Sequence, residues 1–470
     1  MVLQTVAQDY QTVNSARIAS FEYWGDHGFV KIDSVAFEND SILIPFRNIQ
    51  EIDYNCFIPD GAHWIGDKII IRDDGMNVFI NQDSDSIYIN TAASLNDSWT
   101  AFHRPGELSI ISTVISHDTM SFLGLQDSVK TIGFQAYNEI MNPVSHLING
   151  LTIRLSKNHG LVRTLNFSIF PDGKPLQAQQ VIERDISGLS DPVAGIQDFY
   201  WMDIFDFQPG DEIHVKRVWS QTMPETDIQL LILRYLERTD YPDSIVYYAE
   251  RIFSRDYNNG GNYTYTFIHD TIPEIIHANP IFDKLPGEVV TDTITNGSDL
   301  ITYALKMYSG THLAKIIPEE TYWFYNYGDT CWFPIIIDAC VSDYAYYKGL
   351  GGPYLWCWWH TANYRSLVYY KKGAEEWGTP LVIAGMDEQR ISKNVRVYPN
   401  PAREFMHVQL SETALPARIE IFNTMGSLMK EFVLTEATTQ INLQQLKPGL
   451  YFYRIANENG ILGAGKLVVE

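Results

Sequence analysis

Short runs of alternating or wholly apolar residues, separated by clusters of Gly, Asn and Asp, fill the first part of the chain. Apolar side chains that recur at every second position are typical of β-strands with one buried face. Turn signals such as Asp73-Asp74-Gly75 stand between consecutive runs. The pattern predicts strands at Gly28–Ile32, Ser41–Phe46, Lys68–Arg72, Val78–Asn81, Ser86–Asn90, Leu108–Ser116, Val129–Ala136, Leu151–Ser156 and Leu161–Phe170. We therefore expect residues 9–205 to form an antiparallel β-domain, built as a curved sheet, a half-barrel or a sandwich.

A second β-rich block follows the polar stretch Asp172–Asp206, in which Gln197–Phe205 predicts a short helix. Its mixed segment Thr311–Tyr322 also favours a short helix. Strands are predicted at Glu212–Trp219, Leu230–Glu237, Ser244–Phe253, Tyr263–His269, Leu300–Tyr308 and Leu367–Lys371. The block predicts a second domain at 206–383, joined to the last part of the chain by an exposed polar linker at 384–394.

The last part, residues 395–470, contains prolines at turn positions and short runs of alternating apolar and polar residues. The two prolines of Tyr398-Pro399-Asn400-Pro401 fix φ and exclude a helix start. Lys447-Pro448-Gly449 places proline and glycine as a type II turn requires, and Asn459-Gly460 favours a hairpin. The strongest strand patterns are Phe405–Leu410, Arg418–Phe422, Leu428–Leu434, Leu450–Ala456 and Gly465–Val469. Seven short strands at this spacing predict an immunoglobulin-like antiparallel β-sandwich, and the fold class of the whole chain is all-β.

Four blocks of this tail carry a resemblance. They are Val397-Tyr398-Pro399-Asn400-Pro401, then Ile419-Glu420-Ile421-Phe422-Asn423 with Gly426, then Leu446 with Pro448-Gly449-Leu450-Tyr451, and finally Gly465-Lys466-Leu467. In this order they resemble the type A C-terminal sorting domain of cargo proteins of the type IX secretion system (Por secretion system) of the Bacteroidota. The motif residues on which the resemblance rests are Tyr398, Pro399, Asn400, Pro401, Gly426, Pro448, Gly449, Tyr451, Gly465 and Lys466.

The resemblance implies that the outer-membrane machinery of type IX secretion reads this domain and that a sorting peptidase removes it. It further implies that the body is attached covalently to surface lipopolysaccharide or released, so the protein is expected outside the cell or on its surface. Since this route begins with Sec export, Met1–Gln8 is interpreted as the end of a signal peptide. An immunoglobulin-like accessory domain without a sorting role is the alternative.

The net charge of −23 lies entirely before residue 395, because the tail has seven basic and seven acidic residues. An acidic body argues against nucleic acid or an anionic membrane as a partner. A solvated acidic surface without a specific partner explains the same charge. The hydrophobic content of 45% excludes a disordered chain, and no apolar run is long enough to predict a membrane span.

The chain has four cysteines, Cys56, Cys331, Cys340 and Cys357. In an exported protein an even number favours disulfides, of which Cys340–Cys357 is the most plausible, although three complete pairings exist. The spacing lacks the adjacent ligand pairs of a zinc site, so no metal is predicted.

Tyr354–Tyr364 is rich in tryptophan, and in a strand Trp356 and Trp358 share one face. Because flat indole rings stack on sugar rings, these two residues predict a glycan-binding platform. The alternative is that the tryptophans fill the core of the second block.

Sequence motifs for catalysis are absent: there is no HExxH, GxSxG, Walker A or CxxC sequence, and no cofactor or catalytic residue is predicted. Two hypotheses follow. The favoured one is a non-catalytic binding or adhesion module exported by type IX secretion. The other is an extracellular hydrolase, acting on glycans or peptides, whose carboxylate pair has no sequence signature.

Overall fold

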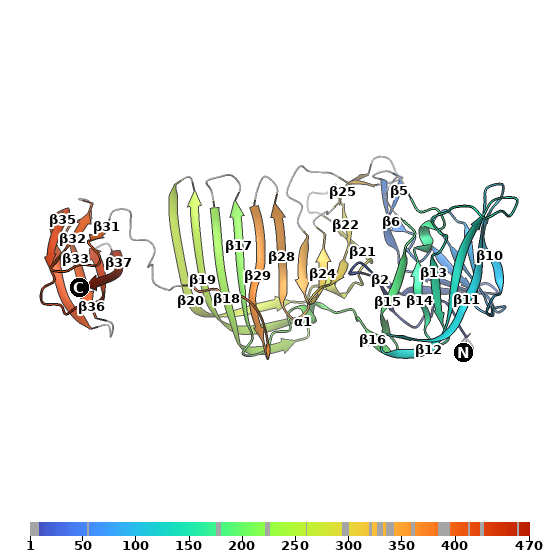
Figure 1. Cartoon of the computed structure of the whole chain (residues 1–470), viewed down its shortest axis with the longest axis horizontal. Coiled ribbons are helices and arrows are strands. Elements are labelled where there is room, and N and C mark those ends of the chain that lie inside the picture. Colours follow the sequence, from blue (N-terminus) through green and yellow to red (C-terminus); the bar gives the residue numbers. More distant parts are fainter. Residues whose placement is uncertain are drawn as a thin grey trace. The chain divides into compact units, whose positions relative to one another are not determined.

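The structure is a computed structural model that describes residues 9–53, 56–174, 180–220, 226–259, 261–293, 300–318, 322–326, 332–334, 343–358, 362–383, 395–411, 414–423, 427–457 and 460–470. For a few of these, among them 356–358, only the backbone is described. The chain forms two compact units, a body at 1–381 and a tail at 382–470 (Figure 1). The boundary expected at 205/206 lies inside the body and stays a prediction, and the predicted linker at 384–394 lies outside the described residues.

One antiparallel sheet of 19 strands runs through the body. Its first part follows the order β10 (Ser98–Arg104), β11 (Leu108–Phe122), β12 (Leu125–Tyr137), β13 (Thr152–Ser156), β14 (Gly160–Leu165), β15 (Glu183–Ser190), β1 (Ala19–Tyr23) and β2 (Asp26–Val30), with β16 (Val193–Gly195) on β15. A second sheet contains β3 (Ile32–Phe37), β4 (Ser41–Pro45), β7 (Lys68–Ile71), β8 (Met76–Ile80) and β9 (Ser86–Asn90). The two sheets share a core of fully buried residues that includes Phe79, Ile89, Ile110 and Ile132. The short 3-10 helix η1 (Phe167–Ile169) is buried with them.

The large sheet continues from β2 to β23 (Lys306–Ser309) through the pair Asp26–Tyr308. From there it follows β24 (Leu313–Ile317), β27 (Tyr344–Tyr347), β28 (Gly351–Trp358), β29 (Ala362–Lys372), β17 (Glu212–Ser220), β18 (Thr226–Tyr241), β19 (Ser244–Asn259) and β20 (Asn262–His277), with β30 (Glu375–Gly378) on β29. The long strands β17 to β20, β28 and β29 lie side by side in Figure 1.

A second core covers one face of this part of the sheet. Helix α1 (Trp201–Ile204) and the 3-10 helix η3 (Pro280–Asp283) pack there, and Phe207 stacks on Tyr235 with ring centroids 4.3 Å apart. A third sheet joins β5 (Asn48–Asp53) and β6 (Cys56–Gly61) to β26 (Trp332–Pro334), β25 (Tyr322–Asn326), β22 (Leu300–Ala304) and β21 (Val289–Thr293). Residues far apart in sequence therefore form continuous sheets.

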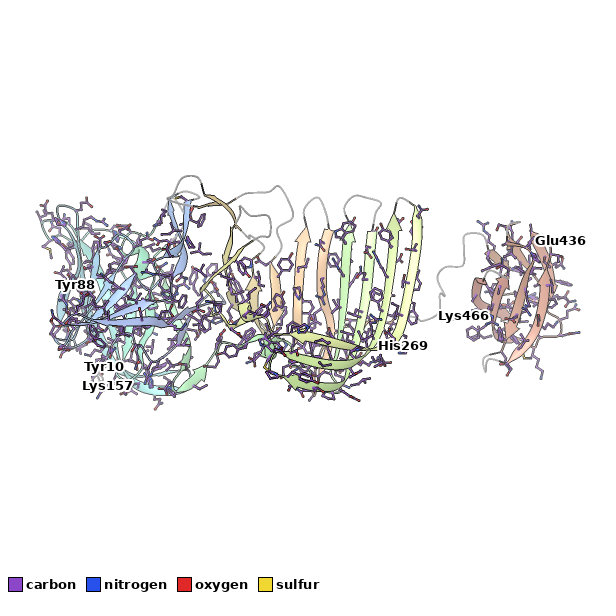
Figure 2. All side chains as sticks on the ribbon, turned by 180° about the vertical axis from the view of Figure 1, so that it is seen from behind. Tyr10, Tyr88, Lys157, His269, Glu436 and Lys466 are labelled. Carbon is purple, nitrogen blue, oxygen red and sulfur yellow. The ribbon has the colours of Figure 1, made fainter. Side chains whose placement is uncertain are left out.

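The tail is a sandwich of two antiparallel sheets. One contains β31 (Val395–Tyr398), β32 (Phe405–Leu410) and β35 (Thr438–Asn442), and the other contains β34 (Leu428–Leu434), β33 (Ala417–Phe422), β36 (Gly449–Asn457) and β37 (Gly460–Val469). Met406, Val408 and Leu410 are buried as their alternation predicts, and Ile419 and Ile421 face them in one core. Figure 2 marks Glu436 and Lys466 on this unit, and Tyr10 near Lys157 in the body.

The all-β fold class is confirmed, and so is the short helix within Gln197–Phe205. The helix expected at Thr311–Tyr322 is wrong, because Leu313–Ile317 forms β24 in the middle of the large sheet. Its alternation is hidden in the sequence by Lys315, a charged residue that is fully buried.

Candidate functional site

The Tyr-Pro-Asn-Pro motif of the tail is bound to the last strand of the same unit. Asn400 Nδ2 donates to the Lys466 carbonyl at 2.6 Å, and its Oδ1 accepts from the Val468 N–H at 2.9 Å. Ala402 extends this contact, since its N–H donates to the Val468 carbonyl at 2.8 Å and it forms a parallel bridge with Val469. The motif therefore covers the edge of β37 that is not paired with β36.

Several of the other motif residues lie on the same strand or pair with it. Gly449 and Tyr451 pair with Val469 and Leu467 across the β36–β37 ladder, and Pro448 is exposed just before it. A Cβ on Gly465 would lie 2.6 Å from the hydroxyl oxygen of Tyr453, so a larger residue there would require the Tyr453 side chain to move. Tyr398 stacks on His407 at 5.5 Å, Pro399 and Pro401 are exposed beside Asn400, and Gly426 lies outside the described residues.

The predicted disulfide and tryptophan platform fall on residues that the structure describes only in part. Cys340 lies outside the described residues, and β28 contains Trp356, Cys357 and Trp358 without a description of their side chains. Cys56, at the start of β6, is disulfide-bonded. Both the Cys340–Cys357 bridge and the platform stay predictions.

A cavity of about 950 Å³ lies on one face of the strands β23, β24, β27, β28, β29 and β30. Alternation along β24 and β27 separates their lining residues from the core. In β24, Ala314 and Ile316 face the cavity while Lys315 points into the opposite side of the sheet. In β27, Tyr347 lines the cavity, and Tyr346 packs on Phe282 of η3 instead.

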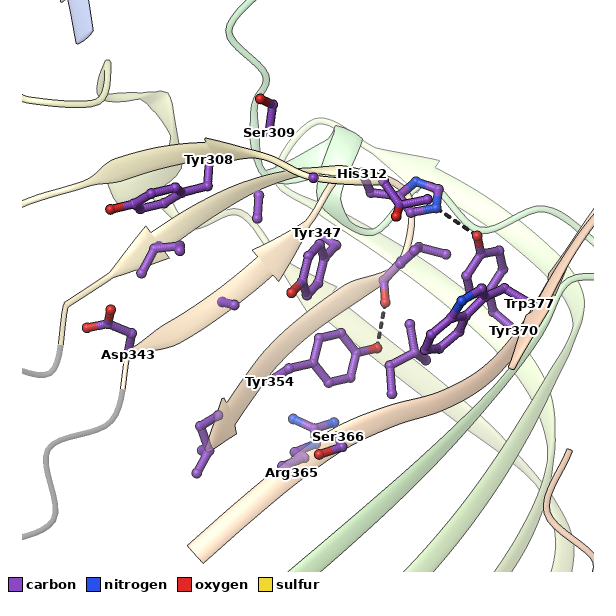
Figure 3. A pocket seen from close by; sticks show the side chains of 18 of the residues that line it. Tyr308, Ser309, His312, Asp343, Tyr347, Tyr354, Arg365, Ser366, Tyr370 and Trp377 are labelled. Atoms are coloured by element: carbon purple, nitrogen blue, oxygen red, sulfur yellow. Dashed lines mark hydrogen bonds between the residues drawn. The ribbon is translucent and has the colours of Figure 1, made fainter. Parts of the chain in front are cut away.

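Five large aromatic side chains line this cavity: Tyr308, Tyr347, Tyr354, Tyr370 and Trp377. Figure 3 shows Tyr308, Tyr347 and Tyr354 on the strands β23, β27 and β28, with Tyr370 and Trp377 together at one side. Trp377 stacks on Tyr370 with centroids 5.9 Å apart, yet 51% of its surface is exposed. Tyr354 and Tyr370 are themselves buried, so the most open aromatic faces of the cavity are those of Trp377 and of Tyr308, which is 38% exposed.

Two of the tyrosine hydroxyls are engaged and two are available. Tyr354 donates to the Leu350 carbonyl at 2.6 Å, and Tyr370 donates to Glu375 at 2.5 Å while His312 Nε2 lies 2.7 Å from its oxygen. Within the described part of the chain the hydroxyls of Tyr308 and Tyr347 have no hydrogen-bond partner. Burial, assisted by the hydrogen bond to Glu375, raises the pKa of Tyr370 to about 12, so this hydroxyl keeps its proton.

Charged groups at the cavity differ in sign. Arg365 reaches the Pro353 carbonyl at 3.2 Å and lies over the Tyr354 ring, and neither it nor Lys306 forms an ion pair with a described residue. Asp343 is the one carboxylate among the described lining residues, and Figure 3 shows it across the cavity from Trp377. Guanidinium, ammonium and phenol groups can all donate to hydroxyl or carboxylate oxygens of a ligand.

The wall at β24 is held from behind by a buried ion pair. Lys315 Nζ lies 2.9 Å from Asp198 and donates to the carbonyls of Phe282 and Lys284 at 2.7 and 3.0 Å. Burial raises the pKa of Asp198 to about 6, although the nearby ammonium group opposes this shift. This carboxylate is therefore a structural partner of Lys315 and is not available to a ligand.

No group of three or more His, Cys, Asp or Glu side chains that could hold a metal ion occurs among the described residues. The helices described are also too short and too polar to cross a membrane.

Comparison with known proteins identifies the tail. A family model described as a secretion system C-terminal sorting domain matches residues 396–470. No curated protein matches the chain. One solved structure comes from work on PorZ, which its title describes as an essential bacterial surface component of the type-IX secretion system of Porphyromonas gingivalis. It is 8% identical, covers 98% of this chain and 81% of that one, and has a TM-score of 0.15, too low to carry an argument.

Residues 396–470 are thus a type IX secretion sorting domain, as the four motif blocks predict. The chain is exported by type IX secretion and is secreted or displayed on the cell surface. Sequence reasoning missed the cavity, because its walls come from six strands between residues 306 and 378 whose order in the sheet the sequence does not reveal. The richness of this segment in tyrosine was the available signal.

Proposed function

We propose that the exported body is a non-catalytic binding module whose cavity binds glycans. The observation that carries the proposal is the cavity of about 950 Å³ with four tyrosines and a half-exposed tryptophan on its walls. Flat aromatic faces suit the apolar faces of sugar rings, and the surrounding donors suit their hydroxyl groups. A rigid sheet holds these groups in place without a ligand, which lowers the entropy cost of binding.

The distribution of carboxylates supports binding over glycoside hydrolysis. A glycosidase of the usual kind needs two carboxyl groups on opposite sides of the bond it cleaves. Asp343 lines the cavity, whereas Glu375 is hydrogen-bonded to Tyr370 and lies 3.1 Å from His312. Asp198, whose pKa is raised, is paired with Lys315 behind the wall.

Calorimetric titration of the full chain with cello-, manno-, xylo- and galacturono-oligosaccharides tests the proposal. We expect one series to bind, and Trp377→Ala to weaken it by about tenfold, or ~1.4 kcal/mol, through loss of the stacking face. Tyr263→Ala is the matched control, because Tyr263 is 59% exposed on β20 and does not line the cavity. Absence of binding by all four series, or an unchanged affinity in Trp377→Ala, would contradict the proposal. Release of new reducing ends from a bound glycan would favour the hydrolase instead.

The proposal extends to the processing of the tail. A sorting peptidase removes the domain after translocation, and the body is attached to surface lipopolysaccharide or released. The separate compact unit at 382–470 supports this, since its removal leaves the core of the body intact.

In the native host, deletion of Val395–Glu470 is expected to retain the protein in the periplasm. Mass spectrometry of the surface form is expected to place its C-terminus within 384–394. A mature form that still ends at Glu470 would refute the processing step.

A further inference from the structure

The hairpin between β1 and β2 carries an unusual residue at its tip. Tyr23 pairs with Asp26, so Trp24 and Gly25 form a two-residue turn. Their φ angles are 53° and 82°, as in the hairpin turn with two left-handed residues that normally takes Asn-Gly. A bulky residue is strained at the first of these positions, and 87% of the Trp24 surface is exposed. Neither local conformation nor burial accounts for a tryptophan here.

The surroundings hold this indole in place. Tyr23 stacks against it with centroids 5.5 Å apart and planes inclined by 16°. The Gly25 N–H donates to Glu22 Oε1 at 2.7 Å and closes the turn. The Arg184 guanidinium lies 6.0 Å from the Tyr23 ring and 5.1 Å from the ring of Trp64. Trp24 is therefore an exposed but supported flat face.

The hairpin tip adjoins the cavity. The Ser309 N–H, on a residue that lines the cavity, donates to the Gly25 carbonyl at 3.0 Å. Asp26 pairs with Tyr308, the aromatic residue on the β23 wall. The backbone thus fixes the hairpin tip beside Tyr308 and Ser309, at the β23 end of the row of strands, whereas Trp377 lies on β30 towards the other end of that row.

We infer that Trp24 is an outer subsite that stacks on a further sugar ring of a glycan whose first rings occupy the cavity. This inference rests on the proposed function. It identifies the ligand class as an oligosaccharide long enough to pass from the cavity, along Tyr308 and Ser309, to the hairpin tip. The indole supplies the apolar face and Tyr23 supports it from behind, as in a stacking platform made of two rings.

Titration of the full chain with two-residue and six-residue members of the bound series, chosen from cello-, manno-, xylo- and galacturono-oligosaccharides, tests the subsite. Trp24→Ala is expected to weaken the six-residue glycan about tenfold and to leave the affinity for the two-residue glycan unchanged. Trp24→Phe keeps an aromatic face and is expected to retain most of the affinity. Tyr241→Ala is the matched control, because Tyr241 is 50% exposed at the tip of the β18–β19 hairpin. A melting temperature equal to that of the wild type verifies each variant.

The outcomes separate the two proposals. Equal affinities of Trp24→Ala and wild type for the six-residue glycan would overturn the subsite and leave the cavity proposal standing. An equal loss for both glycan lengths would also overturn it, because Trp24 would then act on the cavity rather than beyond it. If the wild type binds neither length of any series, the proposed function itself fails.

Discussion

At the scale of single residues, His63 shows how burial decides the charge of a side chain. His63 Nε2 donates to the Phe29 carbonyl at 2.9 Å, and Nδ1 accepts from the Ile65 N–H at 3.1 Å. The ring is also packed edge-on against Phe46. Both nitrogens are used by the neutral ring, and burial lowers the pKa of His63 to about 3.

We predict that the body loses stability in mild acid because of this histidine. In the unfolded chain His63 takes up a proton below pH ~6.5, whereas in the folded chain it stays neutral until a much lower pH. The contribution of neutral His63 to the free energy of unfolding is therefore complete above pH ~6.5 and is lost as the pH falls towards 3. The loss is about 2 kcal/mol at pH 5. Urea denaturation followed by tryptophan fluorescence measures it, since all 11 tryptophans lie in the body.

His63→Gln removes the titrating group and is expected to flatten this pH dependence, while substitution of the exposed His103 by Gln leaves it unchanged. A wild-type free energy of unfolding that is the same at pH 5 as above pH ~6.5 would show that His63 does not titrate as its burial requires.

At the scale of elements, the contact between Asn400 and β37 explains why motif blocks at both ends of the tail occur together. β37 is the edge strand of its sheet, and the Asn400 amide satisfies backbone groups of Lys466 and Val468 on the open side. An unprotected edge would invite pairing with another chain. The motif thus has a structural role in addition to any recognition by the secretion machinery.

Asn400→Ala is predicted to weaken the tail by about 1–3 kcal/mol, the value of two hydrogen bonds at a partly exposed site. Hydrogen exchange of the full chain should then be faster at the Val468 amide, and unchanged in the body. Asn442→Ala is the control within the same unit, because the side chain of Asn442 bonds Gln444 rather than β37. Unaltered exchange at Val468 in Asn400→Ala would argue against the contact.

The strands that sequence could predict are those whose own alternation is visible, such as Ser86–Asn90 and Phe405–Leu410, both found with these bounds. The sequence does not predict β15, because the ion-pair partners of its polar residues lie on other strands. Arg163 of β14 lies 2.7 Å from Asp185 and 2.9 Å from Glu183. β24 was interpreted as helix for the same reason. The partner of Lys315 is Asp198, which lies more than a hundred residues earlier in the chain.

At the scale of the whole molecule, the sequence predicts what many segments become but not which segments meet. The sorting domain could be recognised because its signals are local and its buried core is made of residues from 395–470. The cavity and its proposed outer subsite could not, since the hairpin that carries Trp24 adjoins the cavity through the pair of β2 with β23 and the bond between Ser309 and Gly25. That ladder joins residues nearly three hundred positions apart, and no local pattern encodes it.

The disulfide of Cys56 makes a prediction at this scale. The chain has three other cysteines, Cys331, Cys340 and Cys357, so within one chain the bond must link β6 to the segment 331–357. The ladder between Phe57 and Trp332 already brings these parts together. If Cys340 and Cys357 pair with each other, as the sequence predicts, Cys331 is the remaining partner of Cys56. A non-reducing digest should then yield a Cys56–Cys331 peptide pair. Cys56→Ser should lower the unfolding free energy by about 2–5 kcal/mol, because the bond closes a long loop in the unfolded chain.

Linkage of Cys56 to Cys340 or Cys357 would refute the predicted Cys340–Cys357 bridge. Alkylation of Cys56 without prior reduction would refute the bond between the two parts, and the β6–β26 ladder would then have to hold them together alone.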